Sequence, residues 1–329
     1  MKRRELLGGL AGAAALRPGA GSAQQAQSLP TVAIAFASVE GDPESLQRAR
    51  SFQAGMRDLG WIDGQTVRFA GRWMGNDPAR ARTVADDLVA LKPDVILTMG
   101  TVAATALRAA TKSIPVVFVN VTDPVAGGYV ASLARPGGNM TGFTPFEYPI
   151  AGKWLALLKQ AAPGLSRVAL MGDPNNHNYR GFWGPFETTA QGLGIQPLKL
   201  PVGSAAEIEK GLEDLAAAPG GGVVVSAATF SLAHRELIFA LTARLRLPAI
   251  YWTRFFAATG GLMSYGPDTD ELYAKSAAYV SRILKGAHPA DLPVQTATRF
   301  ETVINLRTAR ALGLQIAPSL ASSADETIE

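Results

Sequence analysis

The chain has 329 residues, of which 47% are apolar and 18% charged, with a formal net charge of +4 and no cysteine. This length and composition predict a globular protein with two domains and buried sheets, and exclude a disordered or fibrous chain. The lack of cysteine excludes disulfides, thiol chemistry and anchoring through an acylated cysteine.

Residues 1–23, "MKRRELLGGLAGAAALRPGAGSA", have the organisation of a secretory signal peptide. A basic start precedes a short apolar stretch, and small residues stand at Gly21 and Ala23, so we expect cleavage after Ala23. The apolar part is too short to span a bilayer. An ordinary N-terminal helix is the alternative, and the Arg3-Arg4 pair leaves both Sec and twin-arginine export open. We therefore expect a freely soluble protein in a bacterial periplasm, without a lipid anchor.

The basic excess belongs to this leader. Once residues 1–23 are set aside, 27 basic and 26 acidic residues remain, a net charge of +1. No run of basic residues with interleaved aromatics occurs elsewhere, so we expect no nucleic-acid partner. No later segment reaches about 18 uninterrupted apolar residues, so we expect no membrane span.

After a tether at 24–30, strands and helices alternate through the first half. Strands are expected at 31–37, 65–73, 94–99 and 116–120, and helices at 43–59, from Pro78 to Lys92-Pro93, and at 101–111. Asp77-Pro78 is typical of a helix start, with an N-cap followed by proline. This alternation predicts a parallel sheet covered on both faces, hence an α/β fold.

The same alternation restarts after a Gly- and Pro-rich stretch at 121–149, interpreted as a crossover. Strands are expected at 167–172, 195–200, 222–227, 248–252 and 260–266, and helices at 150–162, 181–192, 204–218 and 232–245. A helix at 268–285, an extended piece near 293–304, a short helix at 305–313 and a polar tail follow. Two similar α/β units in tandem are therefore predicted.

Enzyme signatures are missing. The three histidines, His177, His234 and His288, lie far apart, and neither H-x-x-x-H nor H-E-x-x-H occurs. The chain has no G-x-S-x-G elbow, no G-x-x-x-x-G-K-S/T loop and no G-x-G-x-x-G after the first strand. We expect no catalytic residue, no metal and no cofactor.

Polar residues instead follow the predicted strands. Gly100 and Thr101 come after strand 94–99, and Thr122 and Asp123 come after strand 116–120. In open parallel sheets ligands bind at these carboxyl ends, where helix N-termini present unpaired N–H groups. The alternative is that all four only cap helices, and Asp123, directly before Pro124, fits that alternative best.

The second half offers a facing set. The stretch "GDPNNHNYRG" after strand 167–172 holds Asn175, Asn178 and Tyr179, which form either a ligand clamp or a polar surface loop. "YWTRF" at 251–255 offers Trp252 or Tyr251 for stacking and Arg254 for a bidentate pair with a carboxylate, with core packing as the alternative for the aromatics.

Tyr265, in "SYG", ends the strand that leads back toward the first half, where a hinge is expected. Its ring is either a pocket wall or a packing element of that hinge. Both interpretations stay open.

The order of these pieces resembles the ABC-transporter substrate-binding proteins, in the broad group with tryptophan- and phenylalanine-binding members. The resemblance covers essentially the whole chain. It rests on an "RRE" leader ending near "AQQ", "GT" at 100–101, "NVTDPV" at 120–125, "ASLARPGGNMTGF" at 131–143, "LPAIY" at 247–251, "GGLMSYGPD" at 260–268, "ADLPVQ" at 290–295 and "INLRTARALGL" at 304–314.

The resemblance implies a type I periplasmic binding fold, with two Rossmann-like lobes joined by three crossings. One lobe would comprise 31–143 with about 266–290, and the other 144–265 with about 291–320, followed by a tail at 321–329 that is not wholly loose. It also implies that Thr144 joins the first-lobe side of the site, and that Asn175, Asn178 and Tyr265 face it. The turn "SAATF" at 226–230 departs from the family, since its Ala227 cannot hold an α-amino group as an acidic residue there does. A neutral or acidic small molecule therefore gains weight over a plain amino acid.

The leading hypothesis is a periplasmic binding protein of an ABC importer. It would capture a small organic molecule (amino-acid-like, a carboxylate or an aromatic acid) and deliver it to an inner-membrane permease, acting as a monomer. The alternatives are a periplasmic sensor that signals to a membrane receptor and an exported enzyme. A DNA-binding regulator would need a helix-turn-helix ahead of residue 31, where the leader lies.

Overall fold

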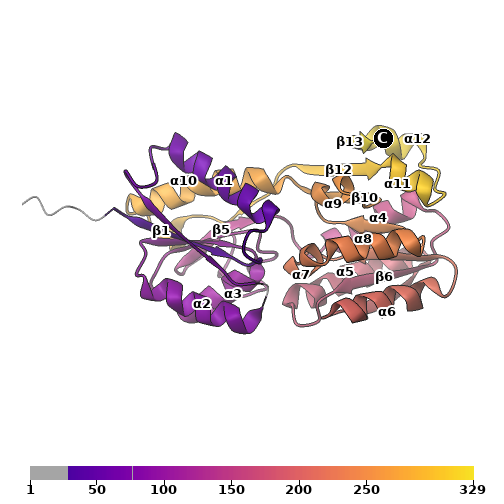
Figure 1. Cartoon of the computed structure of the whole chain (residues 1–329), viewed down its shortest axis with the longest axis horizontal. Coiled ribbons are helices and arrows are strands. Elements are labelled where there is room, and N and C mark those ends of the chain that lie inside the picture. Colours follow the sequence, from indigo (N-terminus) through magenta and orange to yellow (C-terminus); the bar gives the residue numbers. More distant parts are fainter. Residues whose placement is uncertain (1–28, 76) are drawn as a thin grey trace, which may run out of the picture.

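The computed structural model describes residues 29–75 and 77–329, which form two lobes, each built on a central sheet (Figure 1). The expected signal peptide at 1–23 and all but the last two residues of the expected tether lie outside these described residues. Within them, no helix has both the length and the apolar character that crossing a bilayer requires.

The first lobe holds a parallel sheet in the order β11-β5-β4-β3-β1-β2. Its strands are β1 (Thr31–Phe36), β2 (Arg68–Trp73), β3 (Val95–Met99), β4 (Val116–Val119), β5 (Met140–Thr144) and β11 (Gln295–Thr296). The helices α1 (Pro43–Asp58) and α10 (Thr269–Leu284) run along one face, and α2 (Pro78–Ala90) and α3 (Thr101–Ala110) along the other (Figure 1).

Side-chain alternation in β1 explains why its sequence is apolar at every position. Val32, Ile34 and Phe36 pack into the core under α1 and α10, whereas Ala33 and Ala35 pack into the core under α2 and α3. A strand covered on both faces has no solvent side.

The second lobe holds a sheet in the order β13-β12-β10-β9-β8-β6-β7, in which only the β10–β12 pair is antiparallel among the described pairs. Its strands are β6 (Arg167–Gly172), β7 (Gln196–Pro201), β8 (Gly221–Val225), β9 (Ala249–Tyr251), β10 (Met263–Pro267), β12 (Phe300–Asn305) and β13 (Glu326–Ile328). Its helices are α4 (Ile150–Ala161), α5 (His177–Gly192), α6 (Ala205–Ala216), α7 (Thr229–Ala233), α8 (Arg235–Arg244), α9 (Arg254–Ala258), α11 (Leu306–Ala311) and α12 (Pro318–Ser323).

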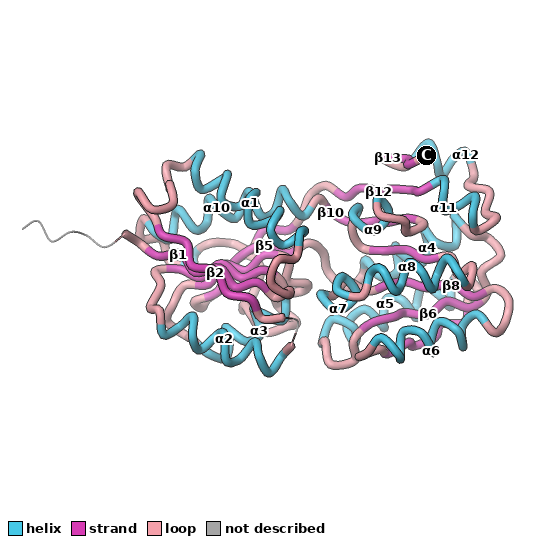
Figure 2. The backbone as a smooth tube through the Cα atoms, in the orientation of Figure 1, coloured by secondary structure: helices cyan, strands magenta, loops and turns pink. Residues whose placement is uncertain are grey.

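The described backbone passes between the lobes three times (Figure 2). The passages join β5 to α4, β10 to α10, and β11 to β12; a short 3₁₀ helix, Pro289–Asp291, lies between α10 and β11. Each lobe is therefore assembled from separate stretches of the chain.

Most predicted elements are confirmed apart from their ends, but the crossover stretch 121–149 contains a strand, β5, that the sequence did not predict. A Cβ on Gly142 in this strand would lie 1.9 Å from the Phe118 carbonyl oxygen of neighbouring β4. The glycine is required for that close approach, and it also hides the strand, because glycine is rare in strands.

In the C-terminal part of the chain one lobe bound differs from the expectation, whereas the tail is not wholly loose, as expected. Gln295–Thr296 pairs with β5 in the first sheet, although residues from about 291 onward were assigned to the second lobe. The predicted tail at 321–329 contains the end of α12 and the strand β13, which pairs with β12. Both strands are short edge strands, and their polar sequences carry no apolar pattern to reveal them.

Two helices of the second lobe also differ. The helix expected at 181–192 begins at His177, and Pro185 lies inside it. The helix expected at 232–245 is two helices, α7 and α8, that meet at His234.

Candidate functional site

The carboxyl end of β3 opens directly into helix α3. Gly100, at φ +95°, is the N-cap of this helix and has no side chain to accept from the first N–H groups. Thr101 forms the first helical residue. The N-terminus of α3 therefore keeps unsatisfied donors and positive partial charge at the strand tip.

The neighbouring strand β4 ends in a similar turn. Asn120 follows it in the left-handed region, at φ +63°, and Thr122 is buried two residues further on. Asparagine tolerates this conformation better than most residues. Both side chains stand beside the N-terminus of α3.

The second lobe brings three strand ends to the same place. Asn176 caps α5 by accepting from the Asn178 N–H, and Asn178 lies in the first turn. Ala227 and Ala228 follow β8, and Trp252 follows β9.

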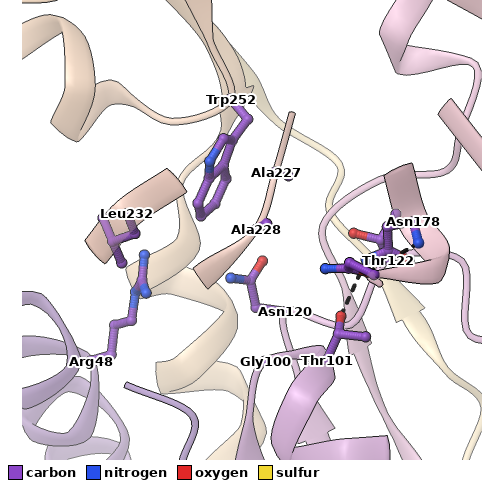
Figure 3. A pocket seen from close by; sticks show the side chains of 11 residues that line it. Arg48, Gly100, Thr101, Asn120, Thr122, Asn178, Ala227, Ala228, Leu232 and Trp252 are labelled. Atoms are coloured by element: carbon purple, nitrogen blue, oxygen red, sulfur yellow. Dashed lines mark hydrogen bonds between the residues drawn. The ribbon is translucent and has the colours of Figure 1, made fainter. Parts of the chain in front are cut away.

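These residues from both lobes line one pocket of about 410 Å³, including the part open to solvent (Figure 3). Five of the residues expected from the sequence lie there. They are Gly100, Thr101, Thr122, Asn178 and Trp252. The remaining lining residues are Arg48, Asn120, Asn176, Ala227, Ala228 and Leu232.

Direct contacts join the lobes around this pocket. The Nδ2 of Asn178 donates to the Oγ1 of Thr101 across the gap at 3.3 Å. Within the second lobe, where the Tyr148 ring packs, the Tyr148 hydroxyl donates to the Oδ1 of Asn178 at 3.4 Å. Arg235, at the start of α8, lies 3.9 Å from the Asp42 carboxylate at the start of α1. The Asn178–Thr101 and Arg235–Asp42 contacts join different lobes, so they form only when the lobes are close.

Tyr148 is positioned by a glycine. A Cβ on Gly181 of α5 would lie 2.3 Å from the Cζ of the Tyr148 ring, so only glycine leaves room for the ring there. Burial, with the Asp123 carboxylate nearby, raises the pKa of Tyr148 to about 12. Its hydroxyl therefore stays protonated at neutral pH and remains the donor to Asn178.

Arg48 is one of the site residues that sequence reasoning missed, and the one that carries a charge. Its side chain is buried on α1, forms an ion pair with Glu44 one turn earlier, and has its guanidinium 5.6 Å from the centre of the Tyr273 ring. Burial raises the pKa of the Glu44 carboxyl, and the Arg48 charge opposes that rise. The signal was helical spacing, since Arg48 shares the buried face of α1 with Phe52 and Met56.

Two buried donors in the pocket have no hydrogen-bond partner. They are the Nε of Arg48 and the Nε1 of Trp252. Figure 3 shows the Arg48 guanidinium and the Trp252 indole reaching into the same space from opposite lobes, beside Leu232 and Ala228. Buried donors are rarely left unpaired, so both call for an acceptor.

The other expected residues do not line this pocket. Asp123, at φ +43°, accepts from the Ala126 N–H, in keeping with the capping alternative, and Thr144 is buried and donates to the Phe146 carbonyl oxygen. Asn175 is exposed and its N–H donates to the Asp173 side chain.

The remaining three expected residues, Tyr179, Tyr265 and Arg254, make contacts within the second lobe. The Tyr179 hydroxyl donates to the Leu170 carbonyl oxygen inside the core, and the Tyr265 ring stacks on Phe300 with ring centres 5.5 Å apart. Arg254 forms the bidentate pair that its fork favours, but with Glu326 of β13, at 2.7 Å for both bonds.

The metal-ligating side chains among the described residues are those of His, Asp and Glu. No group of three or more His, Asp or Glu side chains there could hold a metal ion. His234 contacts the Phe230 carbonyl oxygen within its own helix pair. The lining of the pocket instead presents hydroxyls, amides, one guanidinium and one indole, groups that binding pockets use to orient a ligand.

Comparison with known proteins covers nearly all of the described chain. The family model for "ABC transporter substrate binding protein" matches residues 31–328. The chain is 26% identical over 278 residues to the tyrosine-binding protein of Clostridioides difficile (strain R20291), covering 82% of this chain and 78% of that protein.

Two solved structures have the same fold. The ABC domain from Streptococcus pneumoniae, in complex with L-Trp, is 24% identical with a TM-score of 0.84, covering 92% of this chain and 100% of that one. A conserved domain protein from Vibrio cholerae O1 biovar El Tor is 25% identical with a TM-score of 0.85, covering 91% and 100%.

Proposed function

Because the chain belongs to the ABC transporter substrate-binding protein family, we propose that it captures a small organic solute between its two lobes and delivers it to an ABC permease in the inner membrane. Closure of the lobes over the solute would create the shape that the permease recognises.

One observation supports this proposal above the others. The polar residues at the strand tips of both sheets converge on a single pocket, and two buried donors in that pocket lack partners. A micromolar affinity corresponds to about −8 kcal/mol, which several hydrogen bonds and one aromatic contact supply in a closed pocket.

The similar proteins suggest which solutes to test first. One is named a tyrosine-binding protein, and another was solved with L-Trp. Trp252 offers an aromatic wall in this pocket. We propose a solute that is amino-acid-like, a carboxylate or an aromatic acid.

The rest of the proposal concerns where and how the protein acts. We propose that it works in the periplasm, as a monomer, without catalysis and without nucleic acid. The net charge of +1 beyond residue 23 supports the last point, because nucleic-acid binding relies on a basic surface.

The test of solute capture is binding by the purified protein across a panel of amino acids, carboxylates and aromatic acids. We expect a solute to change the tryptophan emission and to raise the melting temperature, because it binds only the folded state. Trp183→Phe, outside the pocket, should keep the emission change. Unchanged emission and melting temperature throughout the panel would contradict solute capture.

Delivery to a permease needs a separate measurement. Cells that lack the gene should take up the identified solute more slowly than the parent strain, and the gene supplied in trans should restore uptake. Unchanged uptake, with an altered transcriptional response to the solute, would support signalling instead.

A further inference from the structure

The pocket lining carries positive charge and no negative charge. Arg48 is the charged residue among the described lining residues, and none of them is an aspartate or glutamate. The N-terminus of α3, which no side chain caps, adds positive partial charge at the Gly100–Thr101 edge. Glu44, Asp42 and Asp270 act on Arg48, but none of these carboxylates lines the pocket, so its wall offers a ligand positive groups and no carboxylate.

The two buried side-chain atoms of the pocket lining that lack a hydrogen-bond partner are both donors. Arg48 is 5% exposed and Trp252 is 3% exposed. The Nε of Arg48 and the Nε1 of Trp252 both lack an acceptor. Guanidinium and indole N–H groups cannot accept a hydrogen bond. A ligand acceptor in the pocket would satisfy both.

Glu44 does not meet this need. Its carboxylate pairs with the Nη2 of Arg48, and its second oxygen is buried without a partner, while Nε remains unpaired. Glu44 does not line the pocket. It therefore orients Arg48 and leaves one edge of the guanidinium for the solute.

An ammonium group would find no carboxylate partner among the lining residues. The amide of Asn178 is already used on both sides, by Thr101 and by Tyr148. Asp123, which lies near Tyr148, accepts from the Ala126 N–H and does not line the pocket. A zwitterionic amino acid would thus bury an ammonium without a counter-charge, which is costly.

We infer that the solute is a carboxylate without an ammonium group. Its carboxylate oxygens accept from the Nε of Arg48 and the Nε1 of Trp252, and its apolar part lies against Leu232, Ala227 and Ala228. This inference rests on the proposed function and names the substrate class of the same pocket.

Calorimetric titration of the purified protein with matched compounds tests it. One series is 3-phenylpropionate, L-phenylalanine and phenethylamine, and a second is 4-methylpentanoate, L-leucine and isopentylamine. In the series whose skeleton fits, the simple carboxylate should bind about tenfold or more tightly than the amino acid, since it leaves no buried ammonium unpaired. The amine should not bind.

Variants then assign the contacts. Arg48→Gln should weaken carboxylate binding at least about tenfold, and Trp252→Phe, which keeps an aromatic ring and removes the donor, about fivefold, in line with lost charged and neutral hydrogen bonds. Arg50→Gln, an exposed position on the same helix, and Trp183→Phe should bind like the wild type. An unfolding curve checks that each variant is folded. If Arg48→Gln does not fold, the affinity of Trp252→Phe decides the test.

The outcomes separate the two proposals. An amino acid that binds as tightly as its simple carboxylate, or a Trp252→Phe variant with unchanged affinity, would overturn the assignment and leave solute capture intact. Failure of every carboxylate in both series would overturn it as well. Solute capture itself fails only if no compound in the broader panel binds.

Discussion

At the scale of single residues, Thr101 has two roles that the other residues of α3 lack. It opens the helix at the tip of β3, and its hydroxyl accepts from Asn178 of the opposite lobe. The second role depends on lobe closure, so it contributes to solute affinity rather than to the fold of either lobe.

Thr101→Val should therefore weaken solute binding while leaving the melting temperature of the solute-free protein nearly unchanged. Loss of one neutral hydrogen bond costs about 1 kcal/mol, which is about fivefold in affinity. Titration followed by tryptophan emission measures it. Thr105→Val, one turn further along the same helix and outside the pocket, is the control. Equal affinity for Thr101→Val and the wild type would show that the cross-lobe bond does not contribute.

The strand ends made half of the pocket predictable. Gly100, Thr101 and Thr122 were expected because a parallel strand that stops at a small or hydroxyl residue places that residue at the ligand edge of the sheet. Arg48 was not expected, because helical spacing places it on the buried face of α1 but does not show that this face meets the pocket. Arg254 is the opposite case. Its guanidinium was expected to bind the ligand, but it pairs with Glu326.

At the scale of elements, β5 is a first-lobe strand that leads the chain into the second lobe. It lies between β4 and β11 in the sheet, and the chain leaves it for α4 of the other lobe. Its contact with β4 is closest at Gly142, where the Phe118 carbonyl oxygen fills the space of a Cβ. Sequence patterns could not predict this strand, because the backbone contact that requires glycine is not visible in the chain itself.

Gly142→Ala should destabilise the first lobe by about 3 kcal/mol or more, as overpacking against fixed backbone does. Chemical denaturation should show an earlier unfolding transition, and the yield of folded protein should fall. Gly138→Ala, in the same segment, has nothing within 4 Å of the added methyl group and should unfold like the wild type. If Gly142→Ala and Gly138→Ala unfold at the same denaturant concentration, the prediction is wrong, and β4 and β5 move apart easily to admit the methyl group.

At the scale of the whole molecule, the expected α/β fold of the type I periplasmic binding class is confirmed, with two lobes facing each other through their strand tips. The lobe bounds were harder to predict than the lobes, because short strands such as β11 are recognised by their partner and not by their own sequence. Helix positions were predictable where an Asp-Pro start marks them, as at α1 and α2. The start of α5 at His177 was missed because it lies in the polar stretch "GDPNNHNYRG", which was interpreted as a ligand clamp or a surface loop.

The Asp42–Arg235 pair links the lobes next to Leu232, a pocket residue whose carbonyl oxygen accepts from Arg235. Arg235→Gln should weaken solute binding about twofold to fivefold at low salt, the range of a partly exposed ion pair. High salt should weaken the wild type more than the variant, because screening removes what the variant has already lost. Titrations at two salt concentrations measure both effects.

Arg244→Gln is the matched control for that experiment. Arg244 lies on the same helix, and its exposed ion pairs with Glu209 and Glu213 stay within the second lobe. It should behave like the wild type at both salt concentrations. Equal affinities for Arg235→Gln and the wild type at low salt would show that the cross-lobe pair adds nothing to closure.

The three passages of the backbone between the lobes have a consequence for how this protein is made and how it evolves. The first lobe acquires its last strand only when residues 295–296 leave the ribosome, long after most of the second lobe has been synthesised. No single cut in the gene separates one finished half from the other. Recombination at one point in the gene therefore cannot exchange one complete lobe between relatives.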